Sequence, residues 1–159
     1  REDSLVWIAD NSHSFSVKSY YKELAKGGVS DFPWRGIWNS RAPLKVAFFV
    51  WMVAWNGVST MDNLQKRGFL LANRCIMCKK KAETISHFFI HCEVANDLWK
   101  LVFSLVGCSW VLPDSIGAIL GSWVFWKMRK DIKKTWKMIP HCLLWCLWRE
   151  RNKRIFEDK

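Results

Sequence analysis

Three cysteines and one histidine lie close together near the middle of the chain, and these are side chains that bind soft metal ions. Two residues separate Cys75 from Cys78, eight separate Cys78 from His87, and four separate His87 from Cys92. Cysteines two residues apart can point into one tight turn, and thiolate and imidazole together suit tetrahedral zinc. Four protein ligands leave no position for water, so the spacing predicts one structural zinc ion held by these four residues.

Two alternatives stay open for this segment. His91 directly precedes Cys92 and is the other candidate for the fourth ligand, although Cys92 is favoured. A cluster of buried thiols without metal would also explain the residues. Structural zinc contributes roughly 10–16 kcal/mol in small zinc fingers, whereas an ordinary domain is stable by about 5–15 kcal/mol. We therefore expect the segment 75–92 to lose its fold when the metal is removed.

The composition is that of one ordinary folded domain or two small ones. The chain has 159 residues, half of them apolar, with twelve tryptophans. This excludes disorder for most of the chain, and no apolar run approaches the roughly 20 residues of a transmembrane helix. Clustered cysteines beside a histidine, without an apolar leader, favour a reducing intracellular compartment. Because the sequence starts with Arg, we interpret it as a piece of a longer protein.

Positive charge dominates, which favours polyanions as partners. The chain has 25 Lys and Arg against 14 Asp and Glu, a net charge of +11, and residues 127–159 hold eleven of the cations and four of the acids. A second basic group lies between the two ligand pairs. The predicted contacts to RNA or DNA are Lys79, Lys80, Lys81, Lys133, Lys134, Arg149, Arg151 and Arg154. The alternative is solvated surface charge, with Trp136, Trp145 and Trp148 packed in the core instead of stacked on bases.

The elements around these residues are expected to be mainly helical. Residues 5–9 and 14–17 are β-prone and flank turn residues, which predicts a short N-terminal β-hairpin. Ser16 or Ser19 would cap a helix ending near residue 25. Further helices are predicted at 34–38, 44–55, 61–67 and 94–106. Pro113-Asp114-Ser115 is expected to open another short helix, and a last helix is predicted at 142–156, separated from the preceding one by Pro140.

Burial is expected for several of these elements. The helix at 44–55 is apolar nearly all round, and such a helix is usually buried. Trp38, Trp51 and Trp99 are expected inside, beside the zinc segment. Cys142 and Cys146 share one helix face, and a buried face is favoured over a second zinc site.

The predicted fold class is therefore mainly α, a small irregular helical domain with a short N-terminal β-hairpin and a zinc knuckle, followed by a basic helical extension. The domain is placed at residues 1–106, with its core at about 14–100, and the extension at residues 107–159.

Longer motifs surround the metal segment and extend over nearly the whole chain. They are Trp7, Phe15 to Tyr20, Ile37-Trp38, Pro43 to Trp51, Thr60 to Gly68, Glu83-Thr84, His87 to Phe89, Trp99, and Trp145 through Asn152 to Phe156. Together they resemble the zinc-binding domain that follows the reverse transcriptase in plant non-LTR (LINE-type) retrotransposons and derived genes. The resemblance implies zinc binding, and the reverse transcriptase domain of a parent polyprotein as partner. It implies nucleic-acid contact and nuclear residence at the level of the family only.

Catalytic motifs are missing from the sequence. It shows no paired-aspartate polymerase motif, no ribonuclease H carboxylate cluster, no Gly-rich phosphate loop and no nucleophile with a base partner. We therefore expect an auxiliary module that binds nucleic acid and is not itself an enzyme, without a membrane or small-molecule partner. The alternatives are a protein-docking scaffold and a decayed or co-opted fragment.

Overall fold

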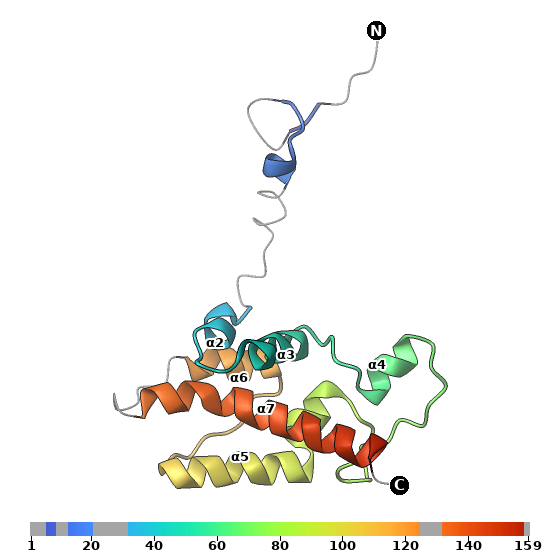
Figure 1. Cartoon of the computed structure of the whole chain (residues 1–159), viewed down its shortest axis with the longest axis vertical. Coiled ribbons are helices and arrows are strands. Elements are labelled where there is room, and N and C mark those ends of the chain that lie inside the picture. Colours follow the sequence, from blue (N-terminus) through green and yellow to red (C-terminus); the bar gives the residue numbers. More distant parts are fainter. Residues whose placement is uncertain (1–5, 9–12, 21–31, 125–131, 158–159) are drawn as a thin grey trace. The chain divides into compact units, whose positions relative to one another are not determined.

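A computed structural model describes residues 6–8, 13–20, 32–124 and 132–157 of the chain. The chain divides into two compact units, residues 1–32 and residues 33–159. Figure 1 shows the helices of the second unit, and no strand occurs in the described ranges, which confirms the mainly helical class. The helices of the second unit are, in chain order, α2 (Trp34–Trp38), α3 (Leu44–Ala54), α4 (Met61–Lys66), the π-helical turn η1 (His87–His91), α5 (Glu93–Val106), α6 (Ile116–Trp123) and α7 (Lys133–Phe156).

The predicted N-terminal β-hairpin is wrong where the structure describes it, because residues 17–20 form a helical turn. The hydroxyl of Ser16 accepts a hydrogen bond from the Ser19 N–H at 3.1 Å, and the Tyr20 N–H donates to the Ser16 carbonyl at 3.0 Å. This cap starts a helix and outweighs the strand propensity of so short a run.

One backbone hydrogen bond, from the Trp7 N–H to the His13 carbonyl at 3.2 Å, joins the two arms of the expected hairpin. A single bond does not make a ladder of strand pairs. Residues 5 and 9–12 of the predicted hairpin, and the helix end predicted near residue 25, lie outside the described residues.

Helix α7 runs through Pro140 without a break, which corrects the predicted interruption. Proline has no N–H, so the carbonyl of Trp136, four residues earlier, loses its helical donor. The indole N–H of Trp123 donates to that carbonyl at 2.9 Å, and the two indole rings stack with centroids 4.4 Å apart. A tertiary hydrogen bond thus replaces the one that proline removes, and the helix continues.

Within the second unit, α7 packs against α3 and α5, and α6 packs against α2 and α3 (Figure 1). Trp136 is buried, and Trp145 and Trp148 are half-buried against the ring of Phe49. The C-terminal tryptophans therefore pack in the core, which is the alternative to stacking on bases. The boundary predicted at residue 106 stays a prediction.

Helix α3 is buried on one side only, which corrects the expectation that it is buried all round. Val46, Phe49 and Val50 face the core, whereas Leu44, Phe48 and Met52 are exposed. The three tryptophans expected inside also differ: Trp99 is buried, Trp51 is half-buried and Trp38 is 37% exposed. Composition alone does not tell which side of an apolar helix meets the core.

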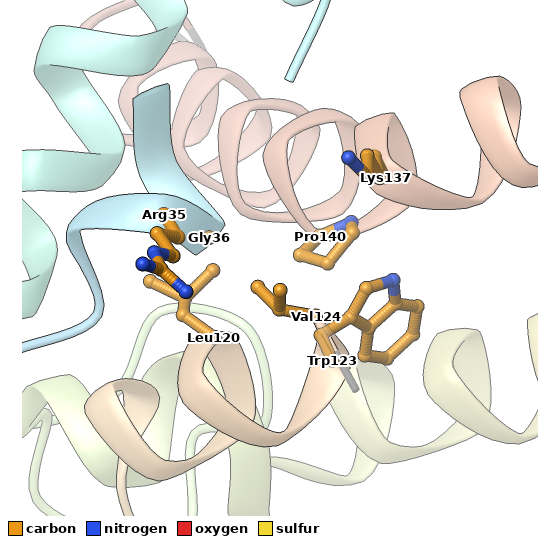
Figure 2. A pocket seen from close by; sticks show the side chains of 7 residues that line it. All are labelled: Arg35, Gly36, Leu120, Trp123, Val124, Lys137 and Pro140. Atoms are coloured by element: carbon orange, nitrogen blue, oxygen red, sulfur yellow. The ribbon is translucent and has the colours of Figure 1, made fainter. Parts of the chain in front are cut away.

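Helices α2 and α6 approach each other closely at a glycine. A cavity of about 10 Å³, with room for a single water molecule at most, lies between α2, α6 and α7 and is lined by Arg35, Gly36, Leu120, Trp123, Val124, Lys137 and Pro140 (Figure 2). A Cβ atom on Gly36 would lie 2.5 Å from the carbonyl oxygen of Leu120. The contact is with backbone, so it does not yield as a flexible side chain would.

Replacing Gly36 by alanine is therefore expected to destabilise the protein by about 1–3 kcal/mol through overpacking. The matched control is Gly117→Ala in α6, where a Cβ would meet no atom within 4 Å. That change is expected to stabilise by about 0.5–1 kcal/mol, because alanine is the better helix former. Urea unfolding of both variants measures the free energy of unfolding. Equal values for the two would contradict the close approach of α2 and α6.

Candidate metal centre

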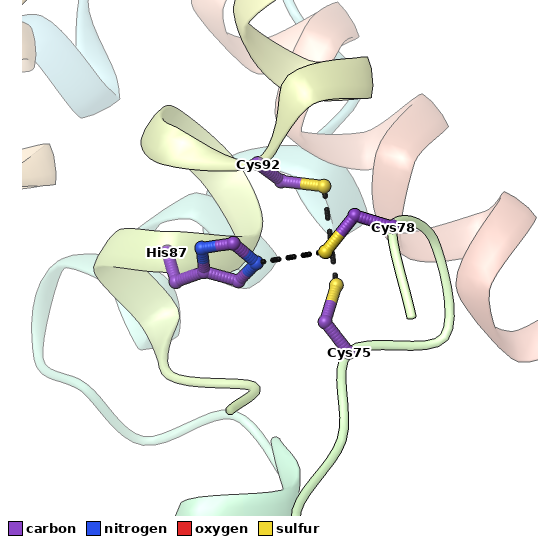
Figure 3. Close-up of side chains that lie close together, drawn as sticks. All are labelled: Cys75, Cys78, His87 and Cys92. Atoms are coloured by element: carbon purple, nitrogen blue, oxygen red, sulfur yellow. Dashed lines mark hydrogen bonds between the residues drawn. The ribbon is translucent and has the colours of Figure 1, made fainter. Parts of the chain in front are cut away.

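Four side chains converge on one point, and they are the four predicted from the sequence. The ligand atoms of Cys75, Cys78, His87 and Cys92 all lie within 4.8 Å of one another (Figure 3). The sulfurs of Cys75 and Cys92 are 3.9 Å apart, and the sulfur of Cys78 lies 3.3 Å from Nε2 of His87. A zinc–sulfur bond of about 2.3 Å sets tetrahedral sulfur–sulfur edges of about 3.8 Å. Both the donor set and its spacing therefore fit one zinc ion.

A tight turn presents the first two cysteines. The Lys79 N–H donates to the carbonyl of Cys75 at 2.8 Å, and the Cys75 N–H donates to the carbonyl of Lys81 at 2.8 Å. Lys79 has a positive φ of 55°, which reverses the chain directly after Cys78. The two residues between the cysteines form the turn, as the spacing predicted.

A π-helical turn presents the other two ligands. The hydroxyl of Thr84 accepts a hydrogen bond from the His87 N–H at 3.1 Å and so starts the turn. The Cys92 N–H then donates to the His87 carbonyl at 2.6 Å, five residues back. This wide turn places His87 and Cys92 on the same side. Turns of the π-helical type are frequent at functional sites. The sequence predicted a helical turn here, but not its π form.

The neighbouring histidine does not join the cluster. Cys92 is fully buried within it, whereas His91 is exposed. Phe88, Phe89 and Ile90, which lie between the two ligands, are also fully buried. The indole N–H of Trp99 donates to the Phe89 carbonyl at 2.9 Å and joins α5 to the turn. The structure therefore groups Cys92, and not His91, with the other three ligands.

The three thiols differ in acidity. Burial raises the pKa of Cys75 to about 12 and also raises the pKa of Cys92. Burial opposes ionisation of Cys78 too, but hydrogen bonds from the backbone N–H groups of Lys80 and Lys81, and from His87, outweigh it and lower the pKa of Cys78 to about 6. Cys78 is thus prepared as a thiolate, the form that zinc binds. The other two thiols release their protons to solvent when zinc binds, so acid weakens zinc binding.

A buried ion pair holds the metal segment against the rest of the unit. Glu83 is fully buried, and its Oε1 accepts hydrogen bonds from Nε of Arg151 at 3.0 Å and from Nη2 at 2.7 Å. The same oxygen accepts the Met61 N–H at 3.1 Å, at the start of α4. The guanidinium also donates to the Ser59 carbonyl and lies 4.6 Å from the Trp148 ring centroid. Glu83 therefore ties α4 and α7 to the loop between the two pairs of metal ligands.

This position corrects the prediction that Arg151 contacts nucleic acid. The residue is only 3% exposed, and its N–H groups are taken up by Glu83, Ser59 and Asn152. Sequence reasoning counted it among the surface cations because its neighbours in α7 are basic. No signal in the sequence couples Arg151 to Glu83, which is 68 residues earlier.

The two basic groups predicted from the sequence come together at the end of α7. One open hollow is lined by Ile76, Lys79, Glu150, Lys153 and Arg154, and we call it the knuckle hollow. Arg154 donates to Glu150 at 2.8 Å, and Lys80, on the same loop, pairs with Glu93 at 2.8 Å. Lys81, Lys133, Lys134 and Arg149 are exposed. Lys79 and Arg154 therefore line the same hollow, whereas Lys133 and Lys134 lie at the other end of α7.

Among the residues that the structure describes, the remaining cysteines form no second metal-binding cluster. Cys142 and Cys146 are exposed on α7, so the expected buried face is wrong. His141 is buried on the other side of the helix, with Nε2 3.0 Å from the carbonyl of Ile37 and 3.1 Å from the hydroxyl of Ser40. None of the six cysteines forms a disulfide.

The chain belongs to the family described as zinc-binding in reverse transcriptase, whose model matches residues 15–99. This confirms the resemblance found in the sequence and zinc as the cofactor. A relative in Arabidopsis thaliana, named "Putative ribonuclease H protein", is 27% identical over 98% of this chain. The chain spans about a quarter of that relative, 26% of its length. No solved structure is a significant match, and no helix of the described residues is long and apolar enough to cross a membrane.

The choice of fourth ligand can be tested with two adjacent substitutions. Cys92→Ser removes a buried thiolate and is expected to leave well under one zinc per chain after dialysis against a mild chelator. His91→Ala removes an exposed side chain next to it and is expected to keep one zinc per chain. Metal analysis of both purified variants decides the question. Full zinc in Cys92→Ser, or loss in His91→Ala, would contradict the assignment.

Proposed function

We propose that this zinc-binding module is an auxiliary nucleic-acid-binding part of a reverse transcriptase polyprotein, without catalytic activity of its own. It would hold RNA or DNA near the polymerase through contacts with phosphates and without sequence readout. The reverse transcriptase domain of the same polyprotein would be its protein partner. A reducing compartment and residence in the nucleus, expected from the sequence, belong to the same proposal.

The observation that carries this proposal is the knuckle hollow. Lys79 comes from the metal turn and Lys153 and Arg154 from the last turns of α7, so residues more than 70 positions apart line one open surface. Glu150 neutralises part of this charge through Arg154. Lys79 and Lys153, both exposed, form no ion pair within the described part of the chain. Such cations gain free energy by releasing counterions from a phosphate backbone.

The arrangement also assigns a role to the metal. Zinc would bind no substrate here, because four protein ligands complete its tetrahedron. Its part is to fix the turn that presents Lys79 beside α7. Zinc binding and nucleic-acid binding are thereby linked through one short loop.

One observation favours a different function, docking on another protein surface. The side of α3 formed by Leu44, Phe48 and Met52 is apolar and exposed. Exposed apolar patches of this kind mark protein interfaces in many soluble proteins. Weak binding of nucleic acid that does not depend on salt would favour this alternative.

The proposal predicts that the zinc-loaded chain binds a labelled single-stranded RNA with a steep dependence on salt. The slope of log K against log salt is expected to be about −0.7 for each phosphate neutralised. A Lys79→Gln/Lys153→Gln/Arg154→Gln variant should bind more weakly and lose about two units of slope, by the same relation for three contacts. Fluorescence anisotropy across a salt series measures both quantities.

The matched control removes three exposed cations elsewhere, in Lys66→Gln/Arg67→Gln/Lys100→Gln. Lys66 and Lys100 pair with nearby aspartates and lie outside the knuckle hollow. The control has the same net charge as the test variant, so the difference between them isolates the hollow. Equal binding by the two variants, or no binding by the unmodified chain at low salt, would refute the proposal.

A further inference from the structure

A second basic hollow lies at the opposite end of α7. It is lined by Asn39, Arg41, Lys133, Lys134 and Lys137, and we call it the first-turn hollow. The link between α2 and α3 supplies the first two residues, and the first turns of α7 supply the three lysines. The sequence analysis singled out Lys133 and Lys134 but had no reason to place Arg41 beside them, because more than 90 residues separate them.

No carboxylate balances these four cations in the described part of the chain. None of them forms an ion pair there. The sequence around both segments explains this, since residues 32–61 and 132–149 contain neither Asp nor Glu. Like charges that converge without a counter-charge repel one another and favour a bound anion.

Three other surface lysines do have a carboxylate partner. Lys66 pairs with Asp62, Lys80 with Glu93 and Lys100 with Asp97. Among the described residues, the knuckle hollow has Glu150 in its lining, whereas the lining of the first-turn hollow has no acidic residue.

The residue that precedes Asn39 in the sequence is aromatic. Trp38 directly precedes Asn39 of the hollow and is 37% exposed. Its ring packs edge-on against Phe48, with centroids 5.1 Å apart, so the ring is held in place at the surface. Partly open aromatic rings that accompany a cationic groove are the platforms on which proteins stack the unpaired bases of single strands.

We propose that the first-turn hollow binds a phosphate of single-stranded nucleic acid while the neighbouring base stacks on Trp38. The inference rests on the proposed function and deepens it, because it names an unpaired strand as the ligand and gives a second contact surface. Lys133 and Arg154 are 21 residues apart on α7, about 32 Å along the helix. A strand that reaches both hollows would run along α7.

The test uses the zinc-loaded chain, a labelled oligouridylate long enough to span α7, and an abasic oligomer of equal length. Arg41→Gln/Lys137→Gln is expected to reduce the salt slope by about 1.4, or 0.7 for each cation. Trp38→Leu should weaken oligouridylate about tenfold or more, while leaving the salt slope and the affinity for the abasic oligomer unchanged. Lys66→Gln/Lys100→Gln is the charge-matched control, and zinc content and thermal melting show whether each variant is folded.

The outcomes separate this inference from the proposed function. If oligouridylate binds and Arg41→Gln/Lys137→Gln behaves like the control, the first-turn hollow is not a site, although the knuckle hollow stands. If the unmodified chain binds no oligomer, both fail together. If an oligoglutamate peptide competes as well as oligouridylate, and Trp38→Leu has no effect on either, the hollow takes an acidic protein segment and the single-strand assignment is wrong.

Discussion

The structure depends on bringing three thiols and one imidazole to a single point. Cys75 and Cys78 reach that point from a tight turn, and His87 and Cys92 reach it from the two ends of a π-helical turn. Phe88, Phe89 and Ile90, between His87 and Cys92, are fully buried, so the same turn both binds the metal and fills the core. Without the ion, two of the three thiols are buried neutral groups and nothing covalent holds the first turn. Metal binding and core packing are therefore one constraint.

The Glu83–Arg151 pair connects the metal segment to helices α4 and α7. A charged pair taken out of water gains little by itself, but removing either partner leaves a buried charge, at a cost of about 3–5 kcal/mol. Here the carboxylate also accepts a backbone N–H at the start of α4, and the guanidinium rests on the Trp148 ring. The pair fixes where the end of α7 lies relative to the metal turn. That placement forms the knuckle hollow.

The metal ligands were predictable because their spacing is local, and α5 and α6 were predictable from periodicity and caps. The N-terminal hairpin failed because of a local serine cap, but most of the other failed predictions concern long-range partners. Arg151 looked like a surface cation because its ion pair is 68 residues away, and Pro140 looked like a helix break because its compensation comes from Trp123. The exposed side of α3 follows from which neighbours it has, and not from its composition. For the same reason the sequence analysis did not single out Arg41, which lies beside the lysines of α7 only in the folded chain.

Hydrogen exchange of the zinc-loaded chain before and after complete chelation tests the central claim most directly. The account predicts that amides of residues 75–92 lose their protection when zinc is removed. The Phe88 and Cys92 amides are the most informative, because each donates to a backbone carbonyl within the metal segment. Amides in the middle of α3 and α7 should lose less, since these helices pack directly on each other. Unchanged protection across residues 75–92 in fully metal-free protein would contradict the account.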